Sequence, residues 1–364
     1  MIQIVVHHLV QRENGLMVDK NMLLKKDNHN IIYSDNFIVY IPYKAIKQKV
    51  ISLEFNQNFL DICHFFNTFF IDRTKNIDSK IYILDSIPKN YNSSYSFDEV
   101  CDISAKEIVS KALFFETEIN LLWSGGIDST TALIAIYKEL KSINKTEYLK
   151  IILSKESIEE FENFFTNFIK KNIVYKIFTP PIFTALNKNN LTITGELGDQ
   201  IFGGNMVYDY MSRADIFDNW REPFSDIVYR KFKYLNKVDS CIDFTQSFMK
   251  RAPFELKSLY DVLWWFSFAS KWQVVQFTLI SQTYQEGVLQ FRLGDNIIHF
   301  FNHIEFQKWA IRNRINQTKY DIYNYKFQAK EYIYDFFPDK NYLLKKQKEK
   351  SLKKVISGTA FSFL

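Results

Sequence analysis

The sequence has 364 residues, of which 47% are hydrophobic and 24% are charged, and its formal net charge is +5. This composition excludes extensive disorder, and so small a net charge is not by itself the signature of a nucleic-acid-binding protein. Three scattered cysteines exclude a disulfide framework and a CxxC metal site, and they favour a reducing, cytoplasmic location. The first residues do not match a signal peptide, and no run of about 18 apolar residues predicts a membrane span.

Glycine is scarce and unevenly placed. The sequence has ten glycines, where average usage of about 7% would give roughly 25. Six of the ten lie in two short stretches, 124–129 and 195–204. Because glycine is favoured where the backbone turns sharply or approaches another group closely, we expect these stretches to form the functional site.

Residues 1–90 are predicted to form a small strand-rich domain. β-branched and aromatic residues favour strands at 31–42, 49–55 and 80–84. Residues 58–70 carry apolar side chains at helical spacing. The polar stretch 85–98 contains Pro88 and shows no periodicity, so we place the domain boundary there.

From residue 97 onward, predicted helices alternate with predicted strands. These elements are expected at 97–113, 118–123, 128–142, 148–154, 155–171, 173–180 and 191–194. The alternation is typical of a doubly wound parallel sheet, so residues 97–364 are predicted to form one α/β domain. Residues 206–335 are predicted to form the helical C-terminal part of this domain. His299 and His303 have the spacing of a metal pair, but their segment is interpreted as an aromatic core helix.

The first glycine stretch has the sequence SGGIDS and joins a predicted strand to a predicted helix. Backbone N–H groups at a helix N-terminus attract anions, and two adjacent glycines let the backbone close around phosphate oxygens. The hydroxyls of Ser124, Ser129 and Thr130 add donors. Asp128 fits such a site if a divalent cation lies between its carboxylate and the phosphate. A plain strand–turn–helix corner is the alternative, and the motif is neither a Walker A loop nor GxGxxG.

The second stretch, GELGDQIFGG, also follows a predicted strand. Because the carboxyl ends of parallel strands meet at one edge of a sheet, both stretches are expected at the edge where such folds bind ligands. Asp199 would then join Asp128 as a second metal ligand. A glycine-rich turn that caps a helix is the alternative interpretation.

Together the two motifs resemble a known family. The sequence SGGIDSTTAL (124–133) resembles the pyrophosphate loop, SGGxDS, of ATP pyrophosphatases. Paired with GELGDQIFGG, it resembles the synthetase domain of asparagine synthetases, whose relatives include β-lactam synthetases and lasso-peptide cyclases. The family's second motif reads approximately GEGADELFGGY. The similarity spans roughly residues 97–355, and LLKKQKEK (343–350) places Lys348 at the family's reactive-site lysine. A solvated lysine is the alternative for Lys348.

The resemblance implies an adenine nucleotide alpha hydrolase-like fold and a synthetase that uses ATP and Mg²⁺. In this family a carboxylate is adenylated with release of pyrophosphate, and an amine or ammonia then displaces AMP to form an amide. The resemblance implies that Asp128 and Asp199 hold Mg²⁺, that Lys348 is catalytic, and that Glu196 acts as a base. A structural hydrogen bond is the alternative for Glu196. The implied nucleotide-binding residues are Ser124, Gly125, Gly126, Asp128, Ser129, Thr130, Gly195 and Gly198.

The sequence departs from the family pattern in several places. Leu197 replaces a small residue, Gln200 replaces a Glu and Asn205 stands where the family often has Tyr, so substrate-side contacts are expected to differ. Asparagine synthetases begin with a glutamine-hydrolysing cysteine, whereas Met1 is followed here by Ile2. We therefore expect amide formation without a glutaminase of the chain's own.

The expected partners are a small-molecule or peptide carboxylate, an amine or ammonia donor, and a partner protein that presents the substrate. Neither a membrane nor a nucleic acid is an expected partner. Two other functions stay open. A tRNA-modifying ATP pyrophosphatase would share the first motif and use the lysine-rich C-terminus, and a non-catalytic nucleotide-binding partner would tolerate Leu197 and Gln200.

Overall fold

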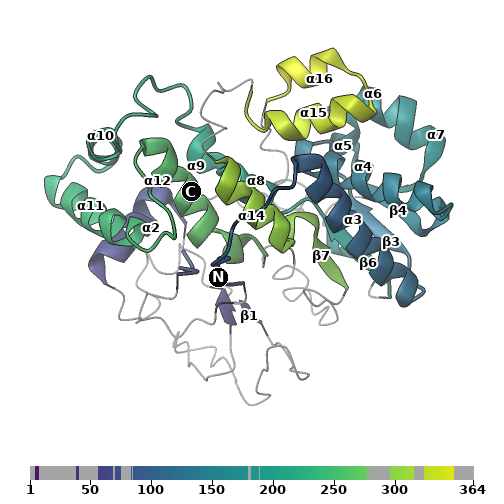
Figure 1. Cartoon of the computed structure of the whole chain (residues 1–364), viewed down its shortest axis with the longest axis horizontal. Helices are drawn as coiled ribbons and strands as arrows, with labels where there is room; N and C mark the ends of the chain where they lie inside the picture. Colours follow the sequence, from purple (N-terminus) through teal and green to yellow (C-terminus); the bar gives the residue numbers. More distant parts are fainter. Residues whose placement is uncertain are drawn as a thin grey trace. The chain divides into compact units, whose positions relative to one another are not determined.

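The computed structural model divides into two compact units (Figure 1). It describes residues 5–7, 38–40, 56–68, 70–74, 83, 85–178, 182–187, 189–276, 279, 296–314 and 324–347. The first unit combines Met1–Lys89 with Asn205–Gln285, and the second combines Asn90–Gly204 with Glu286–Leu364. Units defined by contacts are not necessarily independent folding domains, so the domain boundaries predicted from the sequence stay a prediction. In the described part of the chain, no helix has both the length and the apolar character needed to cross a membrane.

A five-stranded, all-parallel sheet forms the core of the second unit. In spatial order its strands are β5 (Val174–Ile177), β4 (Leu149–Leu153), β3 (Ile119–Leu122), β6 (Leu191–Thr194) and β7 (Ile297–His299). Leu121 lies opposite Ile151 on one side and Ile193 on the other. All four residues of β6 are buried, as expected of a strand inside a parallel sheet. The predicted α/β class with a parallel sheet is therefore confirmed.

The order of the strands reverses between β3 and β6. From β3 the chain moves outward to β4 and then β5, and it returns to the opposite side of β3 to form β6 and β7. Open α/β sheets bind ligands beyond the carboxyl ends of the strands at such a reversal. The segments that leave β3 and β6 at this place are the two glycine stretches.

The helices before β3, after β3 and after β4 agree only in part with the prediction. Helix α3 (Phe97–Phe114) and helix α4 (Ile127–Ser142) lie within a few residues of their predicted bounds. The helix predicted over 155–171 is interrupted at Phe161, whose ring stacks on Tyr342 with 3.8 Å between ring centroids. Its segments are α5 (Lys155–Glu160), α6 (Glu162–Phe164), the π-helical η2 (Phe165–Ile169) and α7 (Lys170–Asn172). Tertiary packing of aromatic rings outweighs helical periodicity at this point.

The aromatic core helix predicted over residues 299–310 is confirmed from Ile304 onward and is wrong for residues 299–303. His299 belongs to β7 and pairs in register with Thr194 of β6, so pairing with the sheet outweighs helical spacing. The 3-10 turn η5 (Phe300–Asn302) follows, and helix α14 (Ile304–Asn313) begins only after His303. His303 caps that helix, because its Nδ1 accepts a hydrogen bond from the Glu305 N–H.

Several shorter elements complete the second unit. They are η1 (Thr146–Tyr148), η3 (Ile182–Ala185), α8 (Gly198–Ile201), α15 (Phe327–Phe336) and α16 (Lys340–Lys345). Helix α9 (Gly204–Tyr208) begins at the last glycine of the second stretch, and its residues from Asn205 onward belong to the first unit. Helix α15 packs against α4 and α3, and α16 packs against α15, at the upper right of Figure 1. The C-terminal helices thus cover the helix that begins at the first glycine stretch.

The first unit is mainly helical and has an aromatic core. Its elements are β1 (Val5–His7), β2 (Ile38–Tyr40), α2 (Gln57–Phe66), α10 (Arg221–Phe232), α11 (Leu235–Met249), α12 (Leu259–Trp265) and the π-helical η4 (Phe266–Ser270). Trp264 and Phe268 are fully buried. The guanidinium of Arg73 lies over the rings of Phe268 and Trp272, and burial lowers the pKa of Arg73 to about 9. The strands predicted at 49–55 and 80–84 lie outside the described residues, apart from residue 83.

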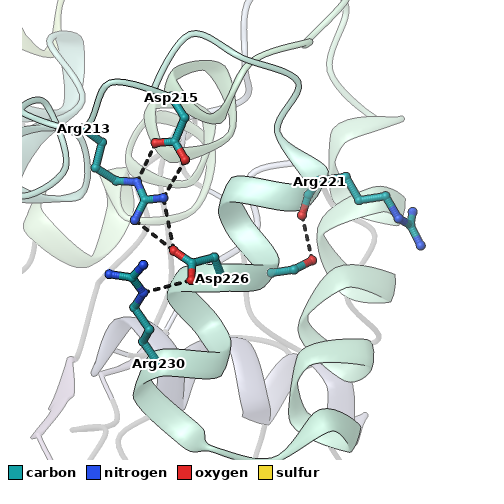
Figure 2. Close-up of polar contacts among 6 residues, drawn as sticks. Arg213, Asp215, Arg221, Asp226 and Arg230 are labelled. Atoms are coloured by element: carbon teal, nitrogen blue, oxygen red, sulfur yellow. Dashed lines mark hydrogen bonds and ion pairs between the residues drawn. The ribbon is translucent and has the colours of Figure 1, made fainter.

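An ion-pair network ties helix α10 to the segment before it, as Figure 2 shows. Arg213 Nη2 lies 2.6 Å from Asp215 Oδ2 and 3.2 Å from Asp226 Oδ2. Arg230 Nε donates to Asp226 Oδ1 over 2.8 Å. The hydrogen bond from Arg213 lowers the pKa of Asp215, and hydrogen bonds from Arg230 and Arg213 lower the pKa of Asp226. The side chain of Arg221 points away from this network.

Candidate functional site

The two glycine stretches lie directly against each other. A Cβ atom on Gly195 would lie 2.7 Å from the backbone nitrogen of Ser129, and one on Gly198 would lie 2.5 Å from Asp128 Oδ1. Both distances are shorter than real Cβ contacts, so a residue with a side chain at either position would have to push its neighbour away. The absence of a side chain on these two glycines lets the stretches meet, as expected for segments that leave adjacent strands.

The first stretch forms a compact turn into helix α4. Gly125 has a φ of +78°, a backbone conformation that favours glycine, and Gly126 is the N-cap of the helix. The Ser124 N–H donates to Ser129 Oγ over 3.1 Å, and the Gly126 N–H donates to Ser124 Oγ over 3.2 Å. Because Gly126 offers no side-chain acceptor, the N–H groups of the first helical turn are not capped by their own N-cap residue. Such a helix N-terminus suits an anion.

A buried ammonium group joins the two stretches. Lys326 Nζ lies 2.5 Å from Asp128 Oδ2 and 2.6 Å from Asp199 Oδ1. The lysine side chain is only 4% exposed, whereas those of Asp128 and Asp199 are 21% and 34% exposed. The structure thus brings together the two carboxylates that the sequence predicts as metal ligands, with a cation of the chain's own between them.

Electrostatics keep this lysine charged. Burial acts to lower the pKa of Lys326, but the charges of Asp128 and Asp199 and the hydrogen bonds to them outweigh burial, so its pKa is raised. Lys326 precedes helix α15 with a left-handed backbone, at a φ of +59°. A non-glycine residue in that conformation carries a backbone cost of about 1–2 kcal/mol. The surrounding contacts therefore fix both the backbone and the charge at this position.

Side chains of β6 and β7 fix the start of the second stretch by hydrogen bonds. Thr194 Oγ1 accepts a hydrogen bond from the Glu196 N–H over 3.1 Å and lies 2.6 Å from His299 Nδ1. Thr194 and His299 are buried, and Glu196 is half-buried. Leu197 is 1% exposed and has a φ of +74°, so this departure from the family pattern places a buried apolar side chain on a left-handed backbone.

The C-terminal segment packs onto the other side of the first stretch. Lys346 Nζ lies 3.1 Å from Glu160 Oε1, and both side chains are less than 10% exposed. The same Glu160 oxygen would lie 3.2 Å from a Cβ atom on Gly126. The Tyr342 hydroxyl contacts the carbonyl oxygen of Gly125 over 3.5 Å. Of the C-terminal lysines that the structure describes, Lys346 is therefore held inside the fold beside the first stretch.

Two carboxylates alone do not form a protein-only metal cage. Among the described residues, no group of three or more His, Cys, Asp or Glu side chains is arranged to hold a metal ion. Mg²⁺ in nucleotide sites is commonly bound by one or two carboxylates, with water and phosphate oxygens as its remaining ligands. The pair formed by Asp128 and Asp199 fits a Mg²⁺ ion that is shared with a phosphate.

The remaining predicted site residues occupy different environments. Ser129 and Thr130 are buried, and Thr130 Oγ1 accepts a hydrogen bond from Trp123 Nε1 over 3.0 Å. Lys348 lies outside the described residues.

Sequence reasoning missed Lys326 because it lies in an aromatic, glycine-free segment without a recognised motif. The available signal was indirect: two carboxylates that meet in a partly buried site require a cation.

No protein-family model matches the sequence, and a search of curated proteins gave no match.

Proposed function

We propose that the chain is an ATP-dependent synthetase that forms AMP and pyrophosphate, adenylates a carboxylate and makes an amide bond. The observation that carries this proposal is the meeting of two glycine stretches at the strand-order reversal. There the carboxylates of Asp128 and Asp199 both contact the ammonium group of Lys326. An anion-binding helix N-terminus beside a carboxylate pair suits a magnesium–polyphosphate ligand. The proposal includes an adenine nucleotide alpha hydrolase-like fold and a cytoplasmic location.

In this proposal the phosphates of ATP lie at the N-terminus of α4. Backbone groups of Gly125 and Gly126 approach them closely, and the hydroxyls of Ser124 and Ser129 donate to them. Thr130 supports the loop from beneath, since it is fully buried. Asp128 and Asp199 hold Mg²⁺, which when bound neutralises phosphate charge as the leaving group departs. The other residues proposed for nucleotide binding are Gly195 and Gly198.

Two further residues are proposed for the amide-forming step. Glu196 directly follows Gly195, and its backbone is fixed by Thr194, so its carboxylate is suited to accept a proton from the incoming amine. Lys348 comes two residues after Lys346, which is anchored by Glu160. The ammonium of Lys348 is suited to stabilise developing negative charge.

Carboxylate-dependent exchange of labelled pyrophosphate into ATP tests the proposal. The protein is incubated with ATP, Mg²⁺ and a panel of small-molecule and peptide carboxylates, followed by an amine or ammonia. We expect exchange with the correct carboxylate, its loss in D128A and D199A, and its retention in D102A, which removes an exposed carboxylate on α3. Exchange that survives D128A would overturn the proposal. ATP binding without any exchange would favour a non-catalytic nucleotide-binding partner, and exchange that requires tRNA would favour the tRNA-modifying enzyme.

A further inference from the structure

The cation between the two carboxylates belongs to the chain itself. Lys326 comes from the C-terminal part of the second unit, 127 residues from Asp199 and 198 residues from Asp128 in the sequence. Its Nζ lies at nearly equal distances from Asp128 and Asp199, 2.5 and 2.6 Å. Two carboxylates and one ammonium leave a local charge of −1, which is less attractive to a free divalent cation than the −2 of an isolated carboxylate pair.

The ammonium and a bridging metal cannot occupy the same place. Mg²⁺ binds carboxylate oxygens at about 2.1 Å, only slightly closer than Lys326 Nζ lies to its two oxygen partners. A metal that bridged the same two oxygens would overlap the nitrogen. The ammonium would have to leave, and because its side chain is 4% exposed, departure requires another anion to replace the carboxylates.

We infer that Lys326 occupies the metal position in the nucleotide-free protein, so that a divalent cation binds to Asp128 and Asp199 only together with a nucleotide. This inference rests on the proposed function. The phosphates of the nucleotide are the anion that arrives with the metal, and the flexible four-carbon stem of lysine lets its ammonium turn from the carboxylates to them. Binding in this order keeps a bare metal ion from occupying the site, and the ammonium balances one of the two carboxylate charges when the nucleotide is absent.

Binding of Mn²⁺, a paramagnetic substitute for Mg²⁺, tests the inference without any turnover. Free Mn²⁺ is measured by electron paramagnetic resonance for the wild type, K326M and K330M, each with and without a non-hydrolysable ATP analogue. Lys330 lies one turn further along α15 and is also fully buried, so K330M controls for the loss of a buried lysine charge.

We expect wild type and K330M to bind one Mn²⁺ only with the analogue, and K326M to bind Mn²⁺ without it at least about tenfold more tightly than wild type does. The gain should disappear in the double variant K326M/D128N. Thermal unfolding tests whether K326M is folded. If K326M is not folded, K326Q is used in its place.

The outcomes separate this inference from the proposed function. If wild type binds Mn²⁺ equally well with and without the analogue, the order of binding is wrong while the metal site stands. If K326M and K326Q gain no affinity while the analogue still promotes binding to wild type, Lys326 does not exclude the metal. If Mn²⁺ binds to none of the proteins even with the analogue, both the inference and the proposed metal site fail.

Discussion

Replacing Gly198 with alanine is the most direct test of how the two glycine stretches meet. The new Cβ atom would lie 2.5 Å from Asp128 Oδ1, whereas ordinary contact begins at 3.4 Å, so the two atoms must separate by 3.4 − 2.5 = 0.9 Å. If Asp128 moves away from Lys326 by that amount, their 2.5 Å contact lengthens to 3.4 Å. At an effective dielectric constant of about 20, this change weakens the attraction by roughly 2 kcal/mol.

Two measurements follow from this displacement. Reduced entropy of the unfolded chain offsets about 0.5–1 kcal/mol of the loss, so we expect G198A to be destabilised by about 1 kcal/mol in urea unfolding. A carboxylate misplaced by nearly 1 Å should also weaken nucleotide-dependent turnover by about 100-fold. For stability the matched control is G126A, because Gly126 has an ordinary φ of −77° and its Cβ would lie 3.2 Å from Glu160 Oε1 and Ser124 Oγ, which requires a shift of only a few tenths of an ångström. A G198A protein with the stability and the turnover of wild type would refute the reasoning.

Two ion pairs give further predictions. R213M should lose about 1 kcal/mol of stability at pH 7. Because the pKa values of Asp215 and Asp226 are lowered in the folded state, this contribution is present above about pH 4 and is lost as the pH falls through the folded pKa values. Urea unfolding at pH 7 and pH 3 checks this, and an equal difference at both pH values would contradict it. E160Q should lose about 3 kcal/mol, because Lys346 then faces a neutral amide at a buried position. A double-mutant cycle with K346M measures the coupling, and additive effects would show that the pair contributes no interaction energy.

The sequence predicts those parts of the fold whose local pattern agrees with the tertiary structure. The strand predicted at 191–194 has the bounds of β6, because four apolar and β-branched residues are followed directly by a glycine turn. The strand that contains His299 is missed, because its aromatic neighbours match a helical spacing as well as they match a strand. Lys326 is missed for a different reason. Its role depends on carboxylates more than 120 residues away, and no local pattern records which lysine of a lysine-rich chain turns inward to meet them.

Two residues beside the carboxylate pair have strained backbones. Leu197 and Lys326 have left-handed backbones, although neither is a glycine, and each therefore costs about 1–2 kcal/mol relative to an ordinary conformation. Leu197 directly precedes Gly198, which contacts Asp128, and Lys326 contacts Asp128 and Asp199. Four other described non-glycine residues, Asn67, Glu116, Asn144 and Lys233, also have left-handed backbones, so what distinguishes Leu197 and Lys326 is their position beside Asp128 and Asp199, not the strain alone.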